Sequence, residues 1–200
     1  MNGLKIGAIA LGMLAIGMLA IGGAAARAEG ATDVPDVIDA FDKYCFAAGA
    51  DRNVTLNLIP DDGVNGKIIP PKQVEAEQGG PGGVAWYVRS PNKLLLEVQY
   101  TPNNICSVDV PKIDTAALFN AAKSFLATKA KGEGVKFTVK DDKKDEQGGL
   151  HQHRVFYMVN QPKAGTTGFM AVSILDGGQL DEHRGQLSFI LTSDPYTEAK

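Results

Sequence analysis

Cysteine, histidine and tryptophan are scarce in this sequence, and two common hydrolase motifs are missing from it. The 200 residues include two cysteines, three histidines and one tryptophan. Neither the G-x-S-x-G elbow of serine hydrolases nor the H-E-x-x-H motif of zinc proteases occurs, so the usual spacings for an activated serine or a catalytic zinc ion are missing. We therefore favour a protein without enzymatic activity and expect no cofactor.

Basic residues are too few for a nucleic-acid-binding protein. The chain has 20 Lys and Arg residues against 23 Asp and Glu residues. Lys5 and Arg27 are the charged residues among the first 28, so residues 29–200 carry 18 basic and 23 acidic side chains and a net charge of −5. Nucleic acids and anionic membranes both bind through a basic footprint, and the composition argues against both partners.

The first 28 residues have the three parts of a secretory signal peptide. Lys5 supplies a positive charge, an apolar run follows over 6–26, and Ala26-Arg27-Ala28 ends it. Small residues at Ala26 and Ala28 suit signal peptidase, which predicts cleavage after Ala28 and a bacterial protein of the periplasm or the cell exterior. The alternative is a retained membrane anchor, because 21 apolar residues reach across a bilayer. The many Gly and Ala residues favour cleavage, and we expect no membrane span afterwards.

The two cysteines, Cys45 and Cys106, both lie after the leader. In an oxidising compartment such a pair without a leftover thiol favours a disulfide. Cys45 falls on the apolar side of a predicted helix, and Cys106 falls on the apolar side of a predicted strand. We therefore expect a buried cross-link that joins the first helix to the sheet.

Residues 29–200 are enough for one globular domain with its own core. Apolar residues at three- and four-residue steps predict helices, and alternating apolar residues predict strands. The predicted helices cover 33–49 and 114–131, and the predicted strands cover 84–89, 93–100, 105–110, 135–140, 153–159, 169–175 and 187–192. The order α-βββ-α-ββββ predicts an α+β fold, with two helices on one face of a mainly antiparallel sheet of about seven strands.

Residues 60–83 form an irregular segment in this prediction. Its proline pair and its Gly79–Gly83 cluster are turn and breaker signals. A long irregular segment on a braced scaffold is often a binding surface. Trp86 and Tyr87 follow it directly and are the candidate partner-binding aromatics, although a place in the core is the favoured interpretation for Trp86.

Two charged stretches are predicted to be solvated. Asp36, Asp39 and Asp42 occupy the polar side of the first helix, where acidic residues near the helix start are favoured. The mixed charges over 140–146 predict a loop between two strands.

His151-Gln152-His153 is the candidate metal-binding motif. Residues two apart on a strand project to the same side, so both imidazoles could meet one ion. His183 is the candidate third ligand, which would complete an open site of the catalytic zinc type. The favoured interpretation, however, is that the histidine pair marks the exposed end of a hairpin beside Gly148-Gly149.

The segment that begins Asp61-Asp62-Gly63 resembles the opening of a calcium loop. The EF-hand pattern needs oxygen ligands at its third and twelfth positions. Gly63 and Lys72 stand at those positions, which favours a pair of turns instead.

These observations favour an exported, non-enzymatic binding or interaction protein of the bacterial periplasm or cell exterior. We expect it to act through a surface near 60–90 and to bind another envelope or extracellular protein. The first alternative is a metal-dependent hydrolase that uses His151, His153 and His183. The second is a structural envelope component, which would have no discrete pocket.

Overall fold

The computed structural model describes residues 33–78, 80–133, 135–161, 166–177 and 182–192. The predicted leader and its cleavage site lie outside these ranges. In chain order the elements are α1 (Val34–Phe41), the π-helical turn η1 (Asp42–Phe46), α2 (Arg52–Leu58), β1 (Gly66–Ile68), α3 (Pro71–Gln78), β2 (Val84–Arg89), β3 (Leu95–Tyr100), β4 (Cys106–Val110), α4 (Thr115–Glu133), β5 (Lys136–Gln147), β6 (Leu150–Gln161), β7 (Thr166–Gly177) and β8 (Glu182–Thr192).

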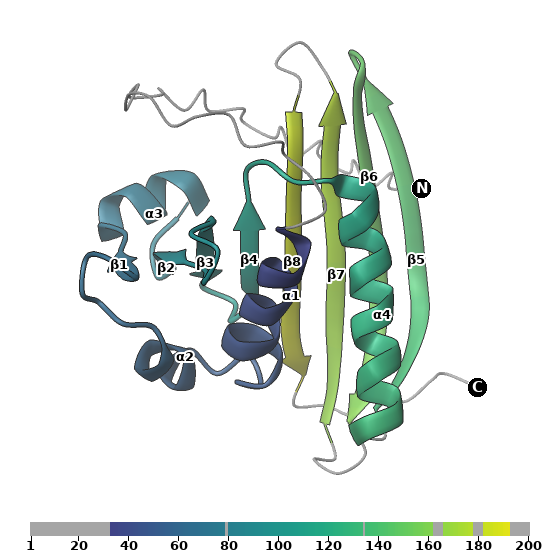
Figure 1. Ribbon diagram of the computed structural model, residues 1–200, viewed down its shortest axis with the longest axis horizontal. Coiled ribbons are helices and arrows are strands. Elements are labelled where there is room, and N and C mark those ends of the chain that lie inside the picture. Colours follow the sequence, from purple (N-terminus) through teal and green to yellow (C-terminus); the bar gives the residue numbers. More distant parts are fainter. Residues whose placement is uncertain (1–32, 79, 134, 162–165, 178–181, 193–200) are drawn as a thin grey trace, which may run out of the picture.

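The eight strands of the described ranges form one antiparallel sheet in the order β1-β2-β3-β4-β8-β7-β6-β5. From β4 the chain crosses through α4 to the far edge at β5, and it returns strand by strand until β8 pairs with β4 (Figure 1). Helices α1 and α4 pack together, with α1 over β4 and α4 along β7 and β8. The predicted α+β class is confirmed, but the sheet has eight strands rather than seven.

The segment over 60–83 is more regular than predicted, because it contains β1 and α3. Ile69, Val74 and Ala85 form a small buried cluster, and Tyr87 packs against it. Ala85 and Tyr87 alternate along β2 with residues of the main core, so α3 covers the opposite face of the sheet from α1 and α4. One buried anchor in α3, Val74, leaves no apolar repeat, which is why the sequence pattern did not predict this helix.

The charged run over 140–146 lies in β5, so the predicted loop is wrong. β5 is an edge strand of 12 residues that pairs with β6 on one side. Exposed charges on an edge strand hinder its pairing with other chains, but they also erase the alternation by which a strand is recognised. Gly148 and Gly149 both have positive φ and form the turn into β6, as predicted.

The predicted disulfide is present and lies in the core. Cys45 and Cys106 are bonded, their Cα atoms are 5.4 Å apart, and both residues are fully buried. Cys45 belongs to η1 and Cys106 to β4, so the bond fastens the first helical segment to the middle of the sheet.

A π-helical turn extends α1 toward the disulfide. The N–H groups of Ala47 and Ala50 donate to carbonyls five residues earlier, which is the π-helical pattern. The turn buries three consecutive side chains at 44–46. Gly49 ends the helical segment with a φ of +65°, as predicted.

Helix α2 is placed by hydrogen bonds more than by apolar packing. Thr55 is fully buried, and its hydroxyl donates to the carbonyl of Tyr44 at 2.5 Å and lies 2.8 Å from the hydroxyl of Tyr100. The apolar residues of α2 are instead exposed at the surface: Val54, Leu56 and Leu58.

A polar network crosses the sheet on the face opposite to α1 and α4. Gln99 and Gln186 donate to the two carboxylate oxygens of Asp109, both at 2.7 Å, and Ser107 donates at 3.3 Å. Gln78 of α3 extends the network by donating to Gln99 at 2.9 Å. Burial raises the pKa of Asp109, and these donors offset part of that rise.

Removing the disulfide should destabilise the protein strongly. Replacing both cysteines by alanine (Cys45→Ala with Cys106→Ala) frees a loop with a sequence separation of 61. The chain-entropy model then gives a loss of about 4 kcal/mol in the free energy of unfolding, to be measured by urea denaturation. A reductant should destabilise the wild type and leave the double variant unchanged. Equal stability of variant and wild type would contradict the bracing role.

The carboxyl group of Asp109 should favour the fold more in mild acid than at neutral pH. Because its pKa is raised in the folded state, Asp109 contributes stability below the unfolded pKa of about 3.9, and this is lost as pH rises through the folded pKa. The free energy of unfolding of Asp109→Asn minus that of wild type should therefore increase between pH 4 and pH 7. Asp145→Asn, at an exposed position of β5, is the control. A difference that shrinks as pH rises would overturn this assignment.

Candidate functional site

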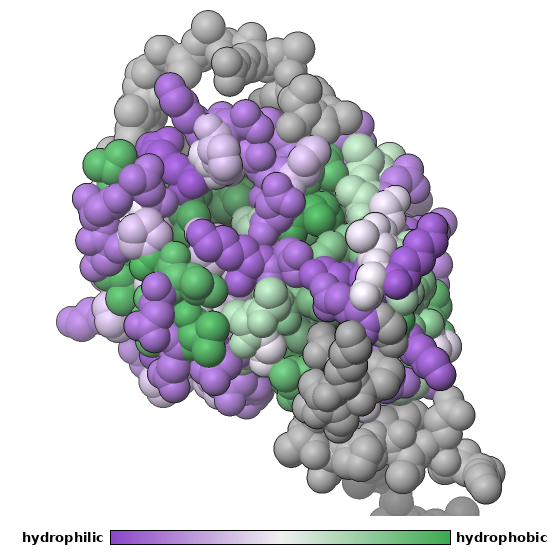
Figure 2. All heavy atoms as spheres, turned by 60° about the horizontal axis from the view of Figure 1, so that its bottom comes forward, coloured by the Kyte–Doolittle hydropathy of each residue, from purple (hydrophilic) through white to green (hydrophobic). Residues whose placement is uncertain are grey.

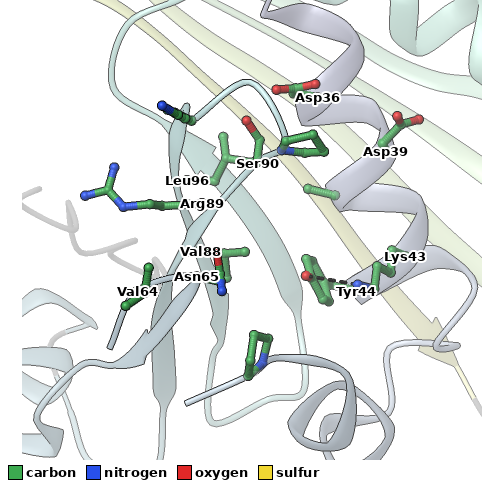
Figure 3. Close-up of a pocket in the computed structure, with 14 residues that line it drawn as sticks. Asp36, Asp39, Lys43, Tyr44, Val64, Asn65, Val88, Arg89, Ser90 and Leu96 are labelled. Atoms are coloured by element: carbon green, nitrogen blue, oxygen red, sulfur yellow. Dashed lines mark hydrogen bonds between the residues drawn. The ribbon is translucent and has the colours of Figure 1, made fainter. Parts of the chain in front are cut away.

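A cleft of about 690 Å³ opens between the α1–η1 segment and the β2–β3 hairpin (Figure 3). Its volume is in the range of ligand pockets. Ala40 and Tyr44 line it from the helical side, and Val88 and Leu96 line it from the hairpin strands. The loop after α2 adds Pro60, Val64 and Asn65 to the lining. Residues from the segment near 60–90 therefore contribute much of the cleft wall.

Asp36 ties the two walls of the cleft together. Its carboxylate accepts hydrogen bonds from the side chain of Asn92 at 2.9 Å and from the Asn92 N–H at 3.3 Å. Asp36 is 6 % exposed, so the predicted solvated face is wrong at this position. Asp42 also departs from it, because its carboxylate lies 3.0 Å from the Lys129 amine of α4. Asp39 is exposed, as predicted.

The loop over 62–66 is held in shape by Asp62. Its carboxylate accepts the N–H groups of Val64 at 2.8 Å, Asn65 at 2.7 Å and Gly66 at 3.3 Å. The hydrogen bonds from Asn65 and Val64 lower the pKa of Asp62 to about 2. The acidic residues that resemble a calcium loop thus belong to a turn, in which the Asp62 carboxylate accepts hydrogen bonds from the backbone of its own loop. Val64 of this turn lines the cleft.

Charges line both sides of the cleft. Arg89 and Lys93 belong to the hairpin side, and Asp39 and Lys43 belong to the helical side. In Figure 3 the Arg89 side chain points away from the helical wall, in keeping with its alternation with Val88 along β2. The Lys43 amine donates to the Tyr44 hydroxyl at 3.3 Å. Among the described residues, the side chains of Arg89, Lys93 and Asp39 have no ionic or hydrogen-bonding partner. Acidic and basic side chains therefore both occur around the apolar lining residues of the cleft.

Ser90 and Lys93 have the S-x-x-K spacing of some serine acyltransferring enzymes. Here the spacing belongs to the predicted turn between β2 and β3. The Ser90 hydroxyl accepts the N–H of Leu94 at 3.0 Å, and the Lys93 N–H donates to the Ser90 carbonyl at 2.9 Å. Within the described ranges no hydrogen bond joins the Ser90 hydroxyl to the Lys93 amine. These contacts give the pair a turn-forming role.

The two candidate aromatics lie away from the cleft opening. Trp86 is 2 % exposed and belongs to the main core. Tyr87 is half-buried against the cluster under α3, and its hydroxyl lies 3.5 Å from the Gln73 amide. Neither residue lines the cleft, so the cleft surface does not include them.

The three histidines lie near one end of the sheet but pair with different carboxylates. His151 Nδ1 is 3.5 Å from Glu146, His153 Nε2 is 2.7 Å from Asp142, and His183 Nδ1 is 2.5 Å from Asp176. His153 also stacks on Phe119 of α4, with 4.3 Å between ring centroids. In the part of the chain that the structure describes, no group of three or more His, Cys, Asp or Glu side chains is placed to hold a metal ion.

Comparison of the chain with protein-family models, with curated proteins and with solved structures gave no match. Across the described ranges, no helix is long and apolar enough to cross a membrane.

The Asp36–Asn92 contact should stabilise the fold and the cleft. Asp36→Ala leaves the Asn92 amide without its acceptor and should lower the free energy of unfolding by about 1–3 kcal/mol. Asp39→Ala is the matched control on the same helix, and we expect a change within about 0.5 kcal/mol. Urea denaturation of Asp36→Ala, Asn92→Ala and the double variant measures the coupling. Additive effects of the two substitutions would show that the contact carries no stability.

Proposed function

We propose that this protein is an exported, non-enzymatic binding protein of the bacterial periplasm or cell exterior, and that the cleft is its ligand site. The observation that carries the proposal is the cleft itself, which combines apolar lining residues with charged ones, of which Asp39 and Lys93 have no side-chain partner among the described residues. The partner is another envelope or extracellular protein.

The way the cleft is built supports binding. Its helical wall continues into η1, which the Cys45–Cys106 disulfide fastens to β4. Its two walls are linked through Asp36 and Asn92. A site whose walls are fixed before the ligand arrives loses less conformational entropy on binding.

The two alternatives have less support. A structural envelope component would need no discrete pocket, whereas the cleft has the volume of a ligand site. A metal-dependent hydrolase would need His151, His153 and His183 to share an ion, and each of them pairs with a different carboxylate.

Site-specific photo-cross-linking in the native cell tests the proposal. A photoreactive amino acid replaces Val64 or Lys93, which line the cleft, or Lys123 or Lys144, which are exposed elsewhere. After illumination, the tagged protein is captured under denaturing conditions and its cross-linked products are identified by mass spectrometry. We expect a discrete protein adduct from both cleft positions and none from the two control positions.

Two results would contradict the proposal. The first is the absence of any adduct at Val64 and Lys93 although the protein is exported and folded. The second is the same adducts at all four positions, because a surface that is contacted everywhere has no specific site.

A further inference from the structure

Asn65 is followed by Gly66 in the loop that leads into β1. It is the one Asn-Gly pair after the predicted leader. Asparagine side chains are among the thermolabile groups of proteins. A glycine at the next position has no Cβ atom, so the backbone nitrogen that follows the asparagine is not shielded by a side chain. The pair therefore combines a labile amide with an accessible nucleophile.

The reaction open to this pair is an intramolecular deamidation. The backbone nitrogen of Gly66 attacks Cγ of the Asn65 side chain and forms a new C–N bond. The bond from Cγ to Nδ2 breaks, and ammonia leaves with the proton of the Gly66 nitrogen. Water then opens the cyclic imide to aspartate or isoaspartate. The balance is one water consumed and one ammonia released, with no other reactant.

The fold holds both reacting groups on one carboxylate. The N–H of Gly66 donates to Oδ1 of Asp62 at 3.3 Å, and Nδ2 of Asn65 donates to Oδ2 of Asp62 at 2.8 Å. The carbonyl of Asn65 belongs to the same peptide group as the Gly66 nitrogen, and it accepts the N–H of Arg89 at 2.9 Å. This peptide group is thus bound at both ends, and its nitrogen cannot turn toward Cγ unless these hydrogen bonds break.

The charge of Asp62 opposes the reaction as well. The N–H groups of Asn65 and Val64 lower the pKa of Asp62 to about 2, so the carboxylate is ionised at neutral pH. A negative charge beside the Gly66 N–H disfavours the deprotonated nitrogen, which is the nucleophile. Both the geometry and the electrostatics of the loop therefore slow the attack.

The packing of the loop requires the glycine that makes the pair reactive. A Cβ atom on Gly66 would lie 1.9 Å from the carbonyl oxygen of Pro60, so no other residue fits there. Asn65 itself is exposed, and water can reach its side chain. The loop follows α2, which lies at the lower edge of Figure 1. Figure 2 turns this edge toward the viewer, and hydrophilic side chains cover much of the surface there.

We propose that Asn65 is a latent deamidation site of this protein, and that the Asp62 carboxylate keeps it unreactive in the folded chain. Deamidation would replace the Nδ2 donor by a second carboxylate beside Asp62. Like charges at such a distance repel, so the loop would lose a bond that shapes it. Because Asn65 lines the cleft (Figure 3), the modification would alter the cleft wall.

Peptide mapping by mass spectrometry tests this inference on the purified protein, incubated at neutral pH with and without urea. Deamidation converts an amide to an acid, and the mass change of the peptide that contains Asn65 measures its rate. We expect the reaction in folded wild type to be slower than in urea by about tenfold or more, because it requires local opening of the loop.

Substitutions separate the role of Asp62 from the order of the loop. Asp62→Ala should accelerate deamidation at Asn65 in the folded protein by about tenfold. Asp62→Ser keeps a weaker, uncharged acceptor and should give an intermediate rate. The matched control is Asp61→Ala, because this neighbouring carboxylate accepts the N–H of Ile68 at 3.3 Å. Its rate should stay within about twofold of wild type. Circular dichroism and urea denaturation verify that each variant is folded.

Three results would overturn the inference. Equal rates in folded wild type and in urea would show that the fold gives no protection. Equal acceleration by Asp61→Ala and Asp62→Ala would assign the protection to loop order and not to the Asp62 carboxylate. An unreactive Asn65 in urea would remove the site altogether. None of these readouts depends on a ligand, so they leave the proposed function to its own test.

Discussion

The carbonyl of Tyr44 and the disulfide beside it are the junction on which the rest of the structure depends. Cys45 is bonded to Cys106 in the middle of the sheet. One residue earlier, the Tyr44 carbonyl accepts the hydroxyl of Thr55 from α2 and, at 3.4 Å, the hydroxyl of Tyr100 from β3. Burial raises the pKa of Tyr100 above the ordinary value of a phenol. Two helices and two strands therefore meet at a single covalent and hydrogen-bonded point.

The position of the cleft and the exposure of the aliphatic side chains of α2 follow from this junction. The π-helical turn fixes Tyr44 where it lines the cleft, and α1 continues from the turn along the same wall. The buried Thr55 hydroxyl turns α2 so that Val54 and Leu58 face outward. Rotating α2 to bury its aliphatic side chains would break the hydrogen bond of Thr55. Because a buried hydroxyl without a partner is costly, this rotation is unfavourable. Core chemistry thus leaves an apolar surface exposed next to a charged cleft.

The sequence predicted the elements in which one side is apolar and the other polar. The hairpin over 84–100, the strand at Cys106 and the helix over 115–133 all have this pattern, and the structure contains them. It did not predict α3, which buries Val74 as its one anchor in the described part of the helix. It also did not predict β5, because protective charges replace apolar alternation on an edge strand. Such elements owe their existence to neighbours that are distant in the sequence.

The cleft could be located only in part from the sequence. Its loop and hairpin residues fall near the segment over 60–90 that was predicted as a binding surface. The helical wall was missed because Asp36 resembles one more acidic residue on a polar helix face, while its partner Asn92 lies 56 positions away. Trp86 stood out by its rarity, but its register against Val98 directs it into the core.

The most direct test of the central claim is the amide hydrogen-exchange footprint of the protein in complex with the partner that cross-links to the cleft. We expect slower exchange on binding over 60–65 and 88–93, which contribute to the cleft wall, with unchanged exchange over 136–147 at the far edge of the sheet. Slower exchange confined to β5–β8, with none at 60–65 or 88–93, would contradict the claim that the cleft is the binding site.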